Sequence, residues 1–164
     1  MRYMMKQRLF SWGDDFYIQD ETGQNRFYVD GKVLSLGHQF SFQDLAGQEI
    51  CFIKQVILSW GQSYEIYKAD QLWATVKKEL FTFFNCRFEV DGGGQNHVEA
   101  SGDFLNHQYT FTRGDQTIAQ VSKQWFTLAD TYGVDVAQDE DDILILASTV
   151  VIDMACHKDR TRLG

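Results

Sequence analysis

Proline is absent from this chain, and cysteine is scarce. The 164 residues include no proline and three cysteines, Cys51, Cys86 and Cys156. Without proline, turns rely on Gly, Asp, Asn and Gln, and every residue of a strand can donate a hydrogen bond to its ladder. The cysteines are widely spaced, odd in number and without a CxxC pair, so neither a disulfide framework nor a zinc site is indicated. They are typical of a protein in a reducing cytosol.

Positive charge is also scarce. The chain has 15 Lys and Arg against 23 Asp and Glu, for a formal charge of -8. Because nucleic acids are recognised mainly by clustered Lys and Arg, we expect no nucleic-acid partner. The first ten residues lack the continuous apolar stretch of a signal peptide. The longest apolar run, 143–152, is shorter than the roughly 20 residues that span a bilayer. The sequence therefore predicts a soluble, cytoplasmic protein without a transmembrane segment.

Aromatic residues are abundant, and they favour β-structure. The chain contains 13 Phe, 7 Tyr and 4 Trp, and 44% of its residues are hydrophobic. Aromatic side chains suit the half-buried surface of a sheet, and the length is that of one domain with one sizeable core. We expect a single domain over residues 1–164.

Two repeats indicate how the strands are organised. The strand-turn stretch that ends in Asp20-Glu21-Thr22-Gly23 recurs 24 residues later as the stretch that ends in Asp44-Leu45-Ala46-Gly47. A longer repeat places His107-Gln108-Tyr109-Thr110-Phe111 69 residues after His38-Gln39-Phe40-Ser41-Phe42. The offset predicts two related β halves of about six strands each. A closed barrel of about twelve strands is wider than the eight whose side chains alone fill the interior.

The apolar run near the C-terminus predicts the element that fills such a barrel. Between Ile143 and Ile152 only Ser148 and Thr149 interrupt the apolar residues, so a helix here is apolar all round and must be enclosed. The acidic block 139–142 before it and the basic tail after it suit the helix macrodipole. We expect a buried helix from about Asp141 to His157, with a core of Ile143, Leu144, Ile145, Leu146, Val150 and Val151.

These features together resemble a known family. The Asp20-x-x-Gly23 and Asp44-x-x-Gly47 hairpins, the duplicated β halves and the terminal apolar helix resemble the LURP-one-related group of the tubby C-terminal-like superfamily. The resemblance implies a twelve-stranded, mostly antiparallel closed barrel around a central hydrophobic C-terminal α-helix. The superfamily includes tubby domains, which bind phosphoinositide headgroups, and phospholipid scramblases. Members of the LURP-one-related branch mostly lack a defined biochemical function.

The candidate lipid-headgroup residues are four cations, Lys68, Lys77, Lys78 and Arg87. Adjacent residues of a strand point to opposite faces of a sheet, so Lys77 and Lys78 cannot both face one ligand. A solvated sheet face explains the same residues. With the acidic net charge opposing anionic lipids, we expect at most weak, salt-dependent peripheral contact with phospholipid, and the helix stays inside the barrel.

A metal or catalytic site is the alternative from another functional class. His97-x-Glu99, with Asp103 and His107, offers ligand types that bind Zn, Fe or Mn, provided that a turn near 101–103 brings His107 back across from His97. The spacing fits no established site, and half-exposed polar residues of a hairpin are the favoured explanation. The run 91–96 lacks the Lys and Ser/Thr of a P-loop, and neither GxSxG nor HExxH occurs. We therefore expect a non-enzymatic binding or scaffold domain, with a lipid or a protein as partner and without a cofactor, a bound metal or catalytic residues.

Overall fold

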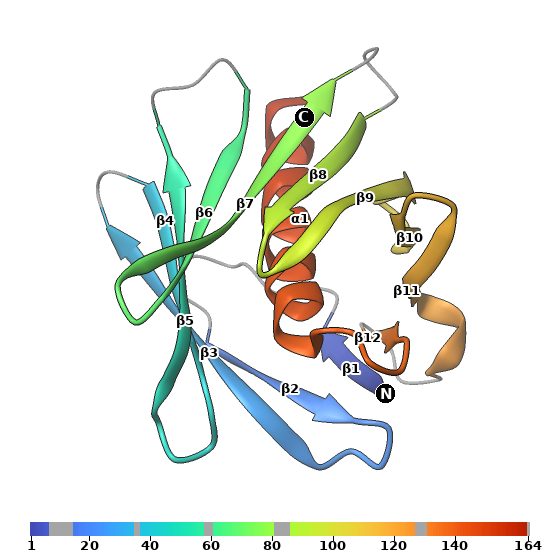
Figure 1. Ribbon diagram of the computed structural model, residues 1–164. Helices are drawn as coiled ribbons and strands as arrows, with labels where there is room; N and C mark the ends of the chain where they lie inside the picture. The colour runs from blue at the N-terminus through green and yellow to red at the C-terminus, as the bar shows by residue number, and fades with distance from the viewer. Residues whose placement is uncertain (7–14, 35–36, 58–60, 81–85, 127–130, 164) are drawn as a thin grey trace.

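The described residues form twelve strands that close into a barrel around one C-terminal helix (Figure 1). The computed structural model describes residues 1–6, 15–34, 37–57, 61–80, 86–126 and 131–163. The strands are β1 (Arg2–Lys6), β2 (Phe16–Asp20), β3 (Asn25–Leu34), β4 (Gly37–Gln43), β5 (Glu49–Val56), β6 (Ser63–Lys68), β7 (Gln71–Leu80), β8 (Cys86–Gly92), β9 (Gln95–Asp103), β10 (Gln108–Arg113), β11 (Gln116–Ser122) and β12 (Thr131–Val136). A short 3-10 helix, η1 (Lys123–Trp125), follows β11, and the α-helix is α1 (Asp142–Leu163).

Pairing between neighbours along the chain builds the barrel, and β1 closes it. Each strand is antiparallel to the next, and β1 pairs with β2 on one side and β12 on the other. Met4 lies opposite Gln19 of β2 and Gly133 of β12. The 69-residue repeat relates β4 to β10, six strands further round the barrel. The predicted fold, a closed twelve-stranded antiparallel barrel with one C-terminal helix, is confirmed.

The two Asp-x-x-Gly turns are built alike. In the first, Asp20 Oδ1 accepts hydrogen bonds from the backbone N of Thr22 at 2.9 Å and of Gln24 at 3.1 Å. In the second, Asp44 Oδ1 accepts from the backbone N of Ala46 and of Gln48, both at 2.9 Å. Gly23 and Gly47 follow with φ of 82° and 81°, which L side chains rarely adopt. The carboxylate and the glycine therefore fix both hairpins locally, as the sequence predicted.

The helix α1 occupies the barrel axis and is enclosed along its first half. Every residue from Leu144 to Ile152 is buried, whereas Ile143 at the mouth is half-buried. Thr149 Oγ1 donates to the carbonyl of Ile145 at 2.9 Å, so this hydroxyl is satisfied within the helix. The backbone stays helical to Leu163, beyond the predicted end near His157. The side chains of the basic tail, His157, Lys158, Arg160 and Arg162, lie outside the described residues.

The acidic block before α1 caps the helix and attaches it to the barrel wall. Asp141 Oδ1 accepts from the backbone N of Leu144 at 3.0 Å, which is the N-cap arrangement that satisfies a helix's first donors. Glu140 accepts two hydrogen bonds from Arg113, at 2.9 and 2.7 Å. Tyr3 of β1 donates its hydroxyl to Asp142. The start of the helix is thus held from β1 and β10.

A buried polar contact holds a later turn of α1. Asp153 lies 3.3 Å from His107 Nε2 and accepts a hydrogen bond from the Tyr132 hydroxyl. The side chains of Asp153 and His107 are 7% and 10% exposed. Burial, with Asp153 beside it, raises the pKa of Tyr132 well above its usual range, so the phenol remains a donor. The contact fixes the helix against the β9–β10 turn and β12.

Replacing Leu146 by Asp tests the enclosure of the helix. Leu146→Asp buries a carboxylate without a partner or forces its protonation, and we expect a loss of several kcal/mol from a stability that is typically about 5–15 kcal/mol. Leu45, 58% exposed in the β4–β5 turn, supplies the matched control Leu45→Asp. The free energy of unfolding of this variant should be close to that of the wild type. Thermal and urea unfolding measure both, and equal stability of the two variants would contradict an enclosed α1.

Replacing Asp153 tests the buried polar contact separately from apolar packing. Asp153→Ala leaves His107 and Tyr132 without their shared partner, and each buried group left unsatisfied costs about 1–3 kcal/mol. The exposed Asp115 provides the control Asp115→Ala, for which we expect a change within about 0.5 kcal/mol. The free energy of unfolding in urea distinguishes them. A loss no larger in Asp153→Ala than in the control would show that this contact does not hold the helix.

Candidate functional site

Charged side chains are concentrated on the outer face of β7, β8 and β9. Alternate residues of each strand face outward, and the register sets Glu79 opposite Arg87 and Glu89 opposite Glu99. The Arg87 guanidinium lies 3.0 Å from Glu79, 3.1 Å from Glu89 and 3.0 Å from Glu99. The hydrogen bond from Arg87 to Glu79 and the neighbouring carboxylates raise the pKa of Arg87. One cation therefore holds together carboxylates from three strands.

A second group lies beside it, around His97. Its Nδ1 lies 2.7 Å from Asp91 Oδ1, and this hydrogen bond raises the pKa of His97. Glu89 completes the group, because one ligand atom from each of Glu89, Asp91 and His97 lies within 4.8 Å of the other two. Strand β8 supplies the two carboxylates and β9 the imidazole. The arrangement offers two oxygens and one nitrogen to a cation.

The glycine turn between β8 and β9 brings these residues together. Gly93 N donates to the carbonyl of Trp73 at 2.7 Å, and a Cβ at Gly92 would lie 2.3 Å from the same oxygen. Only glycine lets the hairpin approach β7 this closely. The run 91–96 thus forms the hairpin turn between β8 and β9, and it places Asp91 beside His97.

Of the residues that the sequence grouped with His97, Glu99 shares its outer strand face, whereas Asp103 and His107 lie further along the chain and away from it. Gln108 pairs with Asp103, and Thr112 with Glu99, so the β9–β10 turn leaves His107 beyond the far end of β9. At a rise of about 3.3 Å per residue, the stretch of β9 from His97 to its end places His107 roughly 20 Å from His97. Glu99 binds Arg87 and Asp103 accepts from Asn106. The hypothesis that a turn at 101–103 returns His107 to His97 is wrong, because the turn comes later.

The sequence analysis did not identify Glu89 and Asp91 as neighbours of His97. The available signal was the glycine run itself, since a tight hairpin centred on 92–94 pairs the residues on either side of it.

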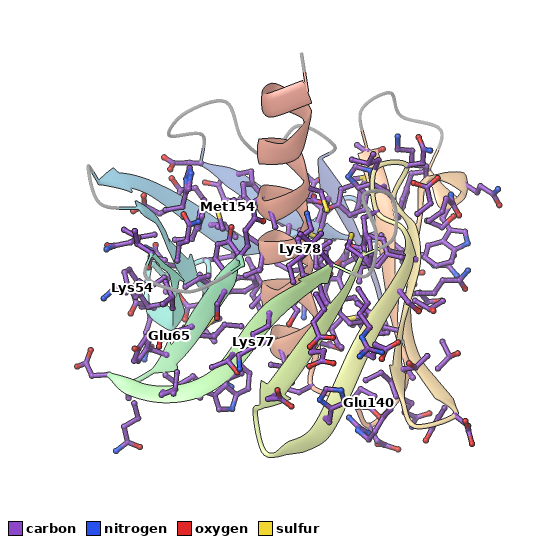
Figure 2. All side chains as sticks on the ribbon, turned by 90° about the horizontal axis from the view of Figure 1, so that it is seen from above. Lys54, Glu65, Lys77, Lys78, Glu140 and Met154 are labelled. Atoms are coloured by element: carbon purple, nitrogen blue, oxygen red, sulfur yellow. The ribbon has the colours of Figure 1, made fainter. Side chains whose placement is uncertain are left out.

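The four candidate lipid-binding cations occupy different surroundings. Lys77 is exposed on the outer face, whereas Lys78 is half-buried on the inner face, with its Nζ 5.9 Å from the Phe88 ring centroid. Figure 2 shows Lys78 nearer to the helix than Lys77. Lys68 Nζ lies 3.3 Å from the Trp73 ring centroid and 3.9 Å from Asp141. The structure therefore does not bring these cations and Arg87 into one patch, and their role in lipid binding remains a prediction.

Two further features limit the chemistry of the described residues. Cys51 is buried, and burial raises the pKa of its thiol to about 12, so it is a poor nucleophile at neutral pH. Within the described part of the chain, no helix combines the length and apolar character needed to cross a bilayer.

Comparisons with known proteins agree with this architecture. The uncharacterized protein YxjI of Bacillus subtilis is 32% identical over 155 residues, which cover 94% of this chain and 93% of YxjI. The X-ray structure of an Arabidopsis thaliana protein superposes with a TM-score of 0.66 over 95% of this chain and 91% of that one, at 17% identity. The family model described as LURP-one-related matches residues 1–153. The chain belongs to the LURP-one-related family.

Proposed function

We propose that this protein is a single, cytoplasmic, non-enzymatic binding domain whose ligand binds on the outside of the barrel. The observation that carries the proposal is the enclosure of α1. Apolar side chains from the strands and the helix share one buried cluster, and the axis of the barrel is occupied by the helix. In a barrel of this kind, recognition is left to the outer face and the two rims.

Weak, peripheral recognition of phospholipid headgroups is the specific form of this proposal. Tubby domains, which belong to the superfamily that the resemblance implies, bind phosphoinositides, and Lys77 is exposed on the outer face. Each Lys or Arg near an anionic membrane contributes about 1 kcal/mol. Since Arg87 is shared among three carboxylates and the net charge is -8, the affinity should be low and strongly dependent on salt.

A protein partner is the second candidate, and exposed apolar side chains at one rim favour it. Ile57, Leu80 and Leu105 are all exposed. Ile57 follows β5, Leu80 ends β7 and Leu105 lies just after β9. These three strands run in the same direction, because alternate strands of an antiparallel barrel are parallel to one another. The three side chains therefore lie at the same end of the barrel, where a protein surface could cover them.

Vesicle co-sedimentation distinguishes a phospholipid ligand from a protein partner. We expect weak binding of the full chain to phosphatidylcholine vesicles that contain phosphoinositide, at about 0.05 M salt, and loss of that binding at about 0.5 M, where the Debye length has fallen to a few ångströms. Lys77→Gln should weaken binding several-fold. Lys54→Gln, which removes an exposed cation from β5, is the matched control and should weaken it less.

Three results would contradict the proposal that the protein recognises phospholipid headgroups. Binding that persists at high salt would indicate apolar insertion. Equal effects of the two lysine variants would indicate general electrostatic attraction without a site. Failure to bind any vesicle at low salt would leave the protein partner as the better proposal.

A further inference from the structure

We propose that Glu89, Asp91 and His97 form a binding site for a divalent transition-metal ion of the Zn²⁺ class. The site lies on the outer face of the β8–β9 hairpin, and its three ligands differ from the residues of the lipid proposal. Its ligand set differs from the one considered from the sequence, where Glu99, Asp103 and His107 accompanied His97 and no bound metal was expected. The pairing of β8 with β9 brings Glu89 and Asp91 to His97 in their place.

The donor atoms are already close to the separations that such an ion requires. Zinc binds imidazole nitrogen and carboxylate oxygen at about 2.0–2.2 Å, so neighbouring ligand atoms around one ion lie roughly 3–4 Å apart. In this protein His97 Nδ1 and Asp91 Oδ1 are 2.7 Å apart, and the three donor atoms lie within 4.8 Å of one another. A shift of the Glu89 carboxylate toward the other two groups would close the set. An ion at its centre would take the place of the hydrogen bond between His97 and Asp91.

The donor types select the class of ion. One imidazole with two carboxylates suits Zn²⁺ and its neighbours among the divalent transition metals. Ca²⁺ and Mg²⁺ prefer oxygen ligands and water, so the imidazole nitrogen favours a transition metal over either. The side chains of Asp91 and His97 are 49% and 50% exposed, and that of Glu89 is 18% exposed. An ion can therefore enter from solvent and keep water or an outside ligand in its remaining positions.

The hairpin holds the site in a fixed geometry. Gly92 approaches β7 too closely for any side chain, and a Cβ at Gly93 would lie 2.7 Å from Leu144 of the enclosed helix. Asp91 and His97 are thus positioned by a turn that packs on both the wall and the core. This lowers the conformational entropy that binding must remove.

Arg87 is the group that competes with the ion. It lies 3.1 Å from Glu89, and Lys77 is opposite Glu89 on β7. The carboxylates of Glu79 and Glu99 both bind Arg87. Their negative charge offsets the positive charge of Arg87 and Lys77. Removing the Arg87 charge should free Glu89 and tighten metal binding, an effect opposite to that of general damage to the hairpin.

Titration with ZnCl₂ tests the site on the full chain without a histidine tag. Isothermal titration calorimetry, or competition with a chromophoric zinc chelator, should show one Zn²⁺ per chain. We expect His97→Ala to weaken binding at least tenfold and Asp91→Asn to weaken it, while Arg87→Gln strengthens it. His38→Ala removes a histidine from β4 and is the matched control, which should bind within about twofold of wild type.

Each result either supports or overturns the site. The opposite signs of the His97→Ala and Arg87→Gln effects would support it, as would a histidine ring resonance of residue 97 that shifts on addition of Zn²⁺. Zinc affinity that is equal in wild type and His97→Ala would overturn it. So would equal losses in His97→Ala and His38→Ala, or no binding at millimolar ZnCl₂.

Discussion

The mutual enclosure of α1 and the barrel is the constraint on which the rest of the structure depends. A helix that is apolar on every side cannot remain in water, and a barrel of twelve strands is too wide for its own side chains to fill. The helix therefore fills the barrel, and the barrel shields the helix from water. Because Leu146 and Val150 are buried on all sides, the energy of this contact is apolar and non-directional, and the polar contacts at Asp141, Asp142 and Asp153 determine how far the helix enters.

This division of roles shapes what the protein can do. Apolar side chains of the strands and the helix fill the interior. The charged and exposed groups that can recognise a ligand therefore lie on the outer face and at the rims. On that face Arg87 pairs with Glu79, Glu89 and Glu99, so its positive charge is not available to a lipid. Three carboxylates against one guanidinium leave the surroundings of His97 negative, which favours the proposed cation.

The fold could be predicted from the sequence because its determinants are local or repetitive. The apolar run predicts the helix, the Asp-x-x-Gly pattern predicts two hairpins, and the alternation along β7 correctly predicts that Lys77 and Lys78 face opposite sides. The neighbours of His97 could not be predicted, because they depend on strand register. Register is set by turn length and closure, and placing the β9–β10 turn only a few residues too early was enough to assign His107 to the wrong end of the strand.

Native-state hydrogen exchange of α1 tests the central claim most directly. Amides enclosed by the whole barrel exchange only when the entire domain unfolds. We predict that the amides of Leu146, Val150 and Val151 give an opening free energy equal to the global free energy of unfolding in urea, with and without phospholipid vesicles. An opening free energy well below the global value, or faster exchange of these amides when vesicles are added, would show that the helix leaves the barrel on its own and would contradict the account.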